Sequence, residues 1–395
     1  MEPRFTDPRG SQAAAAPVPD RPAGPTVAQA APRGAGSVQL PLALAVRARI
    51  PQRLNLALAE MSLLLSVFQV WVLPTWLVPR GTMWLAALLA SLIFTPFQWA
   101  VLHEALHGLL LRDPRRNEAL GRVLGVAFGV PFHLLRFGHL AHHRLNRCEV
   151  DRPEVYDPRR STWAVAALRH YTQILGGMYF GTLAAGQLAL APRPILRAVI
   201  GRTLRHPSAP VTRLRELALS ELAGRRLGAL RVDALGAAAA LGGALAASGQ
   251  GWGLTLAVIY GRGLIISLLD NAYHYGMPLH ARQEARNLTV PRWCKLGLLN
   301  MNLHRAHHRF SYVPWRSLPH WAPELARPQG TLLGGVMAQL RGPVPLWRVA
   351  EVPPVVRRHD GMDPVDTGLA GRRDAMTSVP GRLHGMDSSQ FGAKA

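Results

Sequence analysis

The chain contains very little cysteine: Cys148 and Cys294 are the only two in 395 residues. A framework of several disulfides is therefore excluded, and a reducing compartment is the simpler interpretation. Two isolated thiols also cannot hold an iron–sulfur cluster, which needs about four thiolates. Any electrons that the protein uses must reach it by another route.

Acidic residues are scarce as well, with 23 Asp and Glu against 45 Lys and Arg and a formal net charge of +22. Such a charge would suit a nucleic-acid binder, but the arginines are scattered between apolar runs and through the two tails, and no basic helix is interleaved with aromatics. The cytoplasmic loops of membrane proteins are enriched in Lys and Arg, which accounts for the charge better. We therefore expect a membrane protein with no nucleic-acid partner.

Long apolar runs are missing at both ends of the chain. Residues 1–45 are rich in Ala, Pro, Gly and Arg and lack the apolar core of a secretory signal. Residues 351–395 mix Gly, Arg, Asp and Ser without periodicity. We interpret both segments as disordered extensions that flank one domain at residues 46–350.

Within that domain, four apolar runs are candidates for transmembrane helices, at about 20 residues per span. They cover residues 55–79, 83–102, 232–247 and 252–269, of which the third is short and rich in alanine. A Pro-Arg-Gly turn separates the first pair, and residues 248–251 separate the second. This spacing predicts an all-α integral membrane protein with four transmembrane helices in two hairpins and a cytosolic, histidine-rich helical domain.

Two further apolar stretches, residues 120–135 and 173–191, compete for the role of a span. If residues 173–191 crossed the bilayer as a fifth helix, the histidine clusters before and after them would face opposite sides. Alternatively, residues 173–191 could form a span and residues 232–247 a surface helix. The nine arginines from residue 193 to residue 231 would then lie on the outer side of the membrane, against the positive-inside rule. We therefore expect both stretches to be interfacial or partly inserted helices.

Three histidine clusters stand out in the predicted cytosolic part. They are His103-Glu-Ala-Leu-His107, His139-Leu-Ala-His142-His143 and His304-Arg-Ala-His307-His308. At this histidine content an HxxHH pattern is expected by chance roughly 0.03 times per chain, yet it occurs twice. Because residues at i, i+3 and i+4 lie near one another on a helix surface, we expect the imidazoles of each cluster to converge on one centre.

The positions of the clusters predict a shared metal site. The first cluster lies at the inner end of the second span, the second in the following segment and the third after the fourth span. All three therefore reach the same face of the membrane, where ionisable groups are costly unless they serve a function. Eight imidazoles exceed the roughly four to six ligands of one ion, so we expect two metals, and imidazole nitrogen alone does not choose between iron and zinc.

Two residues at the end of the fourth span are further candidates. His274 emerges on the same face as the clusters, which makes it a candidate ninth ligand. Asp270 lies four residues earlier and shares its helix face. Its carboxylate is in a position to orient a ligand histidine or a metal-bound water.

With these motifs the sequence resembles the membrane fatty acid desaturase family, whose three boxes read HxxxH or HxxxxH, HxxHH or HxxxHH, and HxxHH. The three clusters match these boxes one for one, and the resemblance covers roughly residues 55–319. Members also carry a histidine between the last span and the third box, which His274 matches. An asparagine commonly precedes that histidine by four residues, where this chain has Asp270.

The resemblance implies a cytosolic di-iron centre in a four-span protein. Its implied ligands are His103, His107, His139, His142, His143, His274, His304, His307 and His308. Such enzymes activate O2 with two electrons from a ferredoxin-like or cytochrome b5-like donor and remove two hydrogens from a CH2–CH2 pair of a lipid or thioester acyl chain. No His-Pro-Gly-Gly haem motif of a fused cytochrome b5 occurs, so we expect a separate donor. The implied location is a bacterial inner membrane, with the boxes on the cytoplasmic side.

The chemistry also implies an apolar tunnel. An alkyl C–H bond has no acidic proton, so the enzyme needs a metal–oxygen oxidant and a narrow channel that fixes which carbon meets it. Apolar residues of the spans and of residues 120–135 can line this channel, but ordinary packing in the protein core is the favoured interpretation for them.

Related membrane enzymes share the boxes and provide the alternative hypothesis. Alkane hydroxylases, carotenoid ketolases or hydroxylases and sphingolipid desaturases use them too. The Gln-Arg-His-x-Asp-His-His pattern typical of the alkane hydroxylases is absent, whereas the short first box is also similar to that of carotenoid ketolases. A metal transporter is disfavoured because it would place ionisable groups along its spans. Acyl desaturation is the first hypothesis, and a di-iron hydroxylase or ketolase acting on a lipid, sphingolipid or carotenoid is the second.

Overall fold

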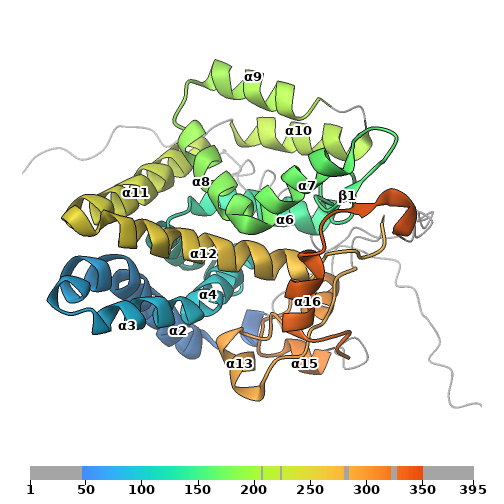
Figure 1. Ribbon diagram of the computed structural model, residues 1–395. Coiled ribbons are helices and arrows are strands. Elements are labelled where there is room, and N and C mark those ends of the chain that lie inside the picture. Colours follow the sequence, from blue (N-terminus) through green and yellow to red (C-terminus); the bar gives the residue numbers. More distant parts are fainter. Residues whose placement is uncertain (1–46, 206–207, 223–224, 280–283, 322–326, 350–395) are drawn as a thin grey trace, which may run out of the picture.

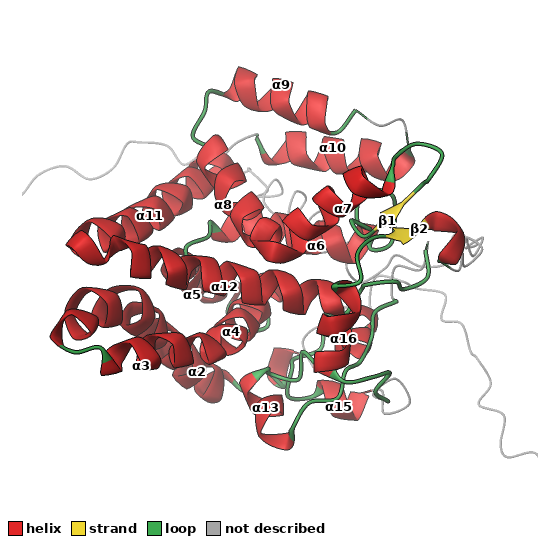
Figure 2. Ribbon diagram, in the orientation of Figure 1, coloured by secondary structure: helices red, strands yellow, loops and turns green. Residues whose placement is uncertain are grey.

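The protein is built almost entirely from helices, as Figures 1 and 2 show. The computed structural model describes residues 47–205, 208–222, 225–279, 284–321 and 327–349, so the two extensions predicted to be disordered lie outside the described residues. Two short strands, β1 (Val155–Tyr156) and β2 (Val344–Pro345), pair in parallel with Val155 opposite Val344.

Four helical segments are each long and apolar enough to cross a membrane, as predicted, and the bent pair Pro114–Phe128 and Phe132–Leu145 is a fifth candidate if it is counted as one span. The first, Gln52–Arg80, consists of α2 (Gln52–Val67), η1 (Phe68–Leu77) and η2 (Val78–Arg80). The second, Met83–His107, consists of α3 (Met83–Ser91), η3 (Leu92–Phe94) and α4 (Thr95–His107). The third, Arg226–Ala247, lies within α11 (Arg225–Ala247), and the fourth, Gly249–Ala272, joins η5 (Gly249–Gly251) to α12 (Trp252–Ala272).

The outer surface of these segments is apolar, which fits a membrane protein. Leu64, Trp76, Ile93 and Val232 are large apolar side chains that are 60–65 % exposed. A contiguous apolar surface of this kind is unfavourable in water and favourable in lipid. Inside the bundle the segments pack on one another through fully buried residues such as Leu73 and Leu102.

A sharp bend follows the second segment and determines where the second histidine box lies. Helices α5 (Pro114–Phe128) and α6 (Phe132–Leu145) meet at an angle of 100°. Gly129, between them, has φ = +88°, and a Cβ there would lie 2.7 Å from the Tyr179 hydroxyl oxygen and 2.9 Å from Leu241 Cδ1. Glycine tolerates both constraints, and it ends α5. Residues 120–135 therefore form parts of two helices, and their interfacial placement stays a prediction.

The remaining helices cover the bundle and its ends. Helices α7 (Trp163–Thr172), η4 (Gln173–Gly177) and α8 (Met178–Leu188) precede the neighbouring pair α9 (Arg193–Thr203) and α10 (Ala209–Glu221), drawn at the top of Figure 1. The predicted stretch 173–191 is not among the four candidate spans of the described chain; η4 and α8 pack against α12. The last elements are α13 (Arg292–Gly297), α14 (His304–Arg309), α15 (Leu318–Trp321), α16 (Leu332–Gln339) and η6 (Leu346–Arg348).

Candidate metal centre

The structure brings all nine predicted histidines together from four parts of the chain. These parts are α4, α6, the turn just after α12 and α14. They form two groups, and within each group the ligand nitrogens all lie within 4.8 Å of one another. The five-histidine group consists of His103, His107, His139, His143 and His307. The four-histidine group consists of His142, His274, His304 and His308.

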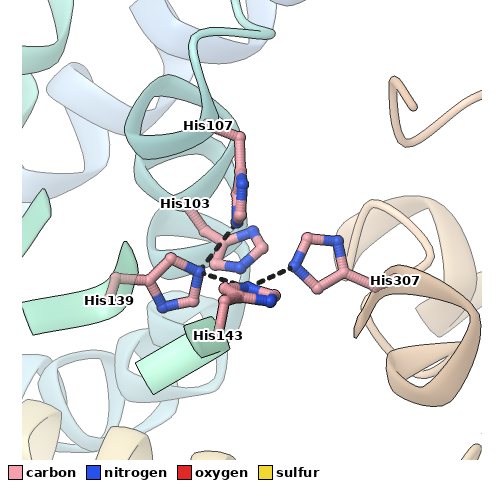
Figure 3. Close-up of side chains that lie close together, drawn as sticks. All are labelled: His103, His107, His139, His143 and His307. Carbon is pink, nitrogen blue, oxygen red and sulfur yellow. Dashed lines mark hydrogen bonds between the residues drawn. The ribbon is translucent and has the colours of Figure 1, made fainter. Parts of the chain in front are cut away.

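The imidazoles of the five-histidine group point toward one another, as Figure 3 shows. The Nε2 atoms of His107 and His139 lie 2.8 Å apart. The Nε2 atom of His143 lies 3.1 Å from the Nε2 atom of His139 and also 3.1 Å from that of His307. His103 is 3 % exposed, and its Nε2 has no hydrogen-bond partner among the described residues. A buried nitrogen without a hydrogen-bond partner, beside four converging ones, is the donor arrangement that a metal ion requires.

The four-histidine group is a closed quadrilateral of Nε2 atoms. Its sides are 3.2 Å from His142 to His274, 3.1 Å from His274 to His304, 3.2 Å from His304 to His308 and 3.3 Å from His308 to His142. Two imidazoles bound at right angles to one ion, with metal–nitrogen bonds of about 2.1 Å, lie about 3 Å apart. The spacing therefore suits one metal ion in each group, in agreement with the two metals predicted.

Each HxxHH box contributes to both groups, which differs from the expectation that one box serves one centre. In α6, His139 and His143 belong to the five-histidine group and His142 to the other. In α14 the division is reversed, because His304 and His308 join His142 while His307 does not. A step of four residues rotates a side chain by about 40° and a step of three by about 60° in the opposite direction, so the i+3 side chain diverges from the other two. The box is therefore suited to bridging two metals.

Burial keeps these imidazoles neutral, which is the form that binds metal. Burial, with the charge of neighbouring imidazoles as a smaller cause, lowers the pKa of His139, His143, His304 and His308 well below the usual range. Burial lowers the pKa of His307 to about 3. His142 is the exception: burial lowers its pKa, but the carboxylates of Asp151 and, to a smaller extent, Asp270 together outweigh burial, so the pKa is raised.

These shifts predict that the metal-free protein is sensitive to acid. The pKa of His307 is about 3 in the folded protein against 6.5 in the unfolded chain, so the unfolded state binds more protons. The stability is fully present above pH 6.5 and is lost as the pH falls from 6.5 toward 3. We expect the unfolding temperature of chelator-treated protein in detergent to fall steadily across this range. An unfolding temperature that rises on acidification would contradict the neutral, buried state.

A carboxylate that sequence reasoning missed orients one of the ligands. Asp151 Oδ2 lies 2.7 Å from His142 Nδ1, so it accepts the Nδ1 proton and leaves Nε2 free to face the group. Asp151 lies in the irregular segment between α6 and β1, where no periodic spacing links it to a histidine. Asp270 belongs to neither group and makes no hydrogen bond to a histidine within the described part of the chain, although its carboxylate interacts electrostatically with His142. Its predicted role, to orient a ligand histidine or a metal-bound water, stays a prediction.

Replacing this carboxylate tests its role. We expect Asp151→Asn to reduce metal affinity or activity about 10–100-fold, which is the usual effect of losing the partner of a ligand histidine. Asp157→Asn is the matched control, because Asp157 lies only six residues further on, directly after β1, and contacts Arg159 N and Arg160 rather than a histidine. Metal titration of both purified variants separates the outcomes. Equal affinities in the two variants would show that the contact with His142 is unimportant.

Two buried networks hold the site segments in place. The guanidinium of Arg147 lies 2.8 Å from Glu154 Oε1 and donates to Met277 O at 2.7 Å, which ties the segment after α6 to the segment after His274. The backbone N–H of Trp315 donates to Glu104 Oε1 at 2.6 Å, and its indole N–H donates to Asn55 Oδ1 at 3.0 Å. The loop after the third box is thereby attached to the first and second segments.

A cavity of about 260 Å³ opens beside the histidines. His139, His142 and His274 form part of its wall, and most of the rest is apolar. Apolar side chains from α4, α5, α6, α8 and α12 line it, including Trp99, Phe128, Leu134, Leu135, Met178 and Ile266. Several of these come from residues 120–135. The histidine groups therefore lie at the wall of a cavity suited to an apolar chain.

Comparison with known proteins agrees with this geometry. The model of the family described as "Fatty acid desaturase" matches residues 82–337, which is more than half of the chain and includes all nine histidines. Neither the curated proteins nor the solved structures gave a match. On its family match and its histidine-lined site, the chain belongs to the fatty acid desaturase family.

Proposed function

We propose that the protein is an O2-dependent di-iron desaturase that introduces a double bond into the acyl chain of a lipid or thioester. The observation that carries this proposal is the pair of adjacent histidine groups in the wall of an apolar cavity. An apolar chain in that cavity has its CH2 groups beside His139, His142 and His274. Such placement fixes which carbons can react.

The nine histidines are proposed as the ligands of two iron ions. Removing two hydrogens from an alkyl chain is an oxidation, and zinc has no redox chemistry, so the reaction favours iron over zinc. Five imidazoles in one group also exceed the four ligands of a usual zinc site. When bound, the two irons would activate O2, which is the oxidant of the alkyl chain.

The chain itself supplies position, orientation and exclusion of water. Asp151 holds the Nδ1 proton of His142 and thereby fixes the orientation of that ring. The apolar side chains of Phe128, Leu134 and Ile266 exclude water from the cavity and pack against the acyl chain. Arg147 and Trp315 hold the segments that carry the second and third boxes.

We further propose the topology on which this chemistry depends. The membrane domain takes up residues 46–350, with its four spans in two hairpins and the boxes on the cytoplasmic side of a bacterial inner membrane. The arginine excess between the second and third spans supports this orientation. A separate ferredoxin-like or cytochrome b5-like protein provides two electrons, and the basic surface would attract an acidic carrier.

Lipid analysis tests the proposed reaction. The full chain is expressed in a bacterial host together with a ferredoxin and its reductase, and the acyl chains are analysed by gas chromatography with mass spectrometry. New unsaturated chains that are absent with His307→Ala would support desaturation. New hydroxy or keto products that depend on His307 would instead assign the chain to the alternative hydroxylase or ketolase chemistry.

A further inference from the structure

Two of the polar side chains that helix α12 presents to the cavity have no hydrogen-bond partner among the described residues. Ser267 and Asp270 both line it, and because they are three residues apart they lie on the same face of the helix, within about one turn. Ser267 is 1 % exposed, and its hydroxyl oxygen has no hydrogen-bond partner among the described residues. Asp270 is half-buried and likewise makes no side-chain hydrogen bond or ion pair within the described ranges.

Several other polar side chains in the cavity wall already have a partner. Asp151 accepts from His142, Arg147 pairs with Glu154, and the Thr182 hydroxyl donates to Met178 O at 3.0 Å. The Asn271 amide donates to Gln339 Oε1 at 2.7 Å. Ser267 and Asp270 therefore differ from these neighbours in having no hydrogen-bond partner among the described residues, although the Asp270 carboxylate interacts electrostatically with His142.

An unsubstituted acyl chain would leave both side chains unpaired. Methylene groups neither donate nor accept hydrogen bonds, and a buried polar group without a partner costs about 1–3 kcal/mol, more when it is charged. A carboxylate only accepts, so it requires a donor from the ligand. A site with unpaired polar groups discriminates against analogues that lack the matching group.

The location of the pair relates the donor to the reacting carbon. Asp270 precedes His274 by four residues and lies close to the end of α12 at Ala272. His274 belongs to the four-histidine group, and it lines the same cavity as Asp270. A ligand donor bound at Asp270 thus lies only a few carbons from the part of the chain beside the histidines.

We propose that Ser267 and Asp270 form a polar subsite that binds a hydroxyl or amino group of the substrate close to the carbon that is oxidised. The substrate class is then a long-chain lipid with a hydrogen-bond donor near the reacting position, rather than an unsubstituted saturated acyl chain. The inference rests on the proposed function for the meaning of "reacting position", whereas the binding subsite itself does not.

Equilibrium binding tests the subsite without turnover. The full, metal-loaded chain in nanodiscs is kept free of reductant and O2, and a fluorescent fatty amide is displaced by fatty amides of one length. One competitor is unsubstituted, and the others carry a single hydroxyl at successive carbons or a single amino group at the same positions. We expect at least one hydroxylated probe to bind about tenfold or more tightly than the unsubstituted one. Equal affinities across the series would overturn the proposal.

Four variants locate the preference. Asp270→Leu is expected to abolish it, Ser267→Ala to weaken it, and Thr182→Val to leave it unchanged, because the Thr182 hydroxyl is already bonded to Met178 O. Asp270→Asn keeps an acceptor for a hydroxyl but loses the charge that favours a protonated amine, so only the amine preference should be lost. A preference that survives in both Asp270 variants would overturn the assignment. If Asp270→Leu does not fold, Asp270→Asn with the amine probes decides.

The binding series and the lipid analysis can fail separately. A donor preference without any oxidised lipid in cells would leave the subsite standing and count against the proposed reaction. Unsaturated products from unsubstituted acyl chains, together with equal affinities in the binding series, would support the proposed reaction and overturn the proposed subsite.

Discussion

Replacing His304 with alanine is expected to reduce the metal content of the purified protein from two ions per chain to about one and to abolish most activity. His304 supplies two sides of the closed quadrilateral of Nε2 atoms, at 3.1 Å from His274 and 3.2 Å from His308. The three remaining imidazoles leave the site open, and we expect them to bind too weakly to retain the ion through purification. Losing even an indirect partner of a ligand costs about 10–100-fold, so we expect the loss of a ligand to exceed 100-fold.

His320→Ala is the matched control for this experiment. His320 lies in α15, sixteen positions after His304. Its side chain is exposed and belongs to neither histidine group. Both variants lose one imidazole, but only His304→Ala should lose metal, as measured by elemental analysis per protein. Full metal content and activity in His304→Ala would contradict the four-histidine group as a metal site.

A matched loss in the other group sharpens the comparison. His307→Ala leaves four imidazoles in the five-histidine group, whereas His304→Ala leaves three in its group. We therefore expect His307→Ala to weaken metal binding less than His304→Ala does. The ranking follows from the number of ligands that remain.

The spans and the boxes were predictable from the sequence because both are encoded locally. A run of about 20 apolar residues identifies a membrane helix whatever surrounds it. The predicted second run, residues 83–102, lies within Met83–His107, and the helix extends beyond it because the first box continues the same helical repeat. His103 and His107 share a face for the same local reason.

The division of the boxes between two groups was not predicted, because it depends on which helices approach from which side. Spacing alone places His139, His142 and His143 near one another on α6, and it does not say that α4 meets one edge and α14 the other. The 100° bend near Gly129 sets these approaches. A glycine followed by a proline indicates a break, but the angle depends on the contact with Tyr179 and Leu241.

The role of Arg147 was also hidden from the sequence, because its partners lie in distant segments. An arginine four residues after a histidine box attracts no attention in a chain with a net charge of +22. In the structure its backbone has φ = +64°. Its side chain is completely buried and contacts both Glu154 and the Met277 carbonyl. A buried charge must be paired, and only the tertiary structure shows how.

We expect Arg147→Met to destabilise the protein by about 3–5 kcal/mol, because it leaves the Glu154 carboxylate buried without its partner. Both side chains of the pair are almost inaccessible, at 0 % and 1 % exposure, so water cannot replace the lost contact. The measurement is the unfolding free energy or the unfolding temperature of the purified protein in detergent. Metal content should also fall, since the pair ties the segment after α6 to the segment that carries His274.

Two further variants decide between loss of a specific pair and general sensitivity of this region. The double variant Arg147→Met, Glu154→Leu removes both charges and should recover much of the stability lost in Arg147→Met, because no charge is then buried alone. Arg160→Met breaks the exposed pair with Asp157, in which the arginine is 80 % exposed, and should cost less than about 1 kcal/mol. If the double variant is as unstable as Arg147→Met, then the hydrogen bond to the Met277 carbonyl, rather than the unpaired carboxylate, accounts for the loss. Wild-type stability in Arg147→Met would instead contradict the buried network as the support for this side of the metal centre.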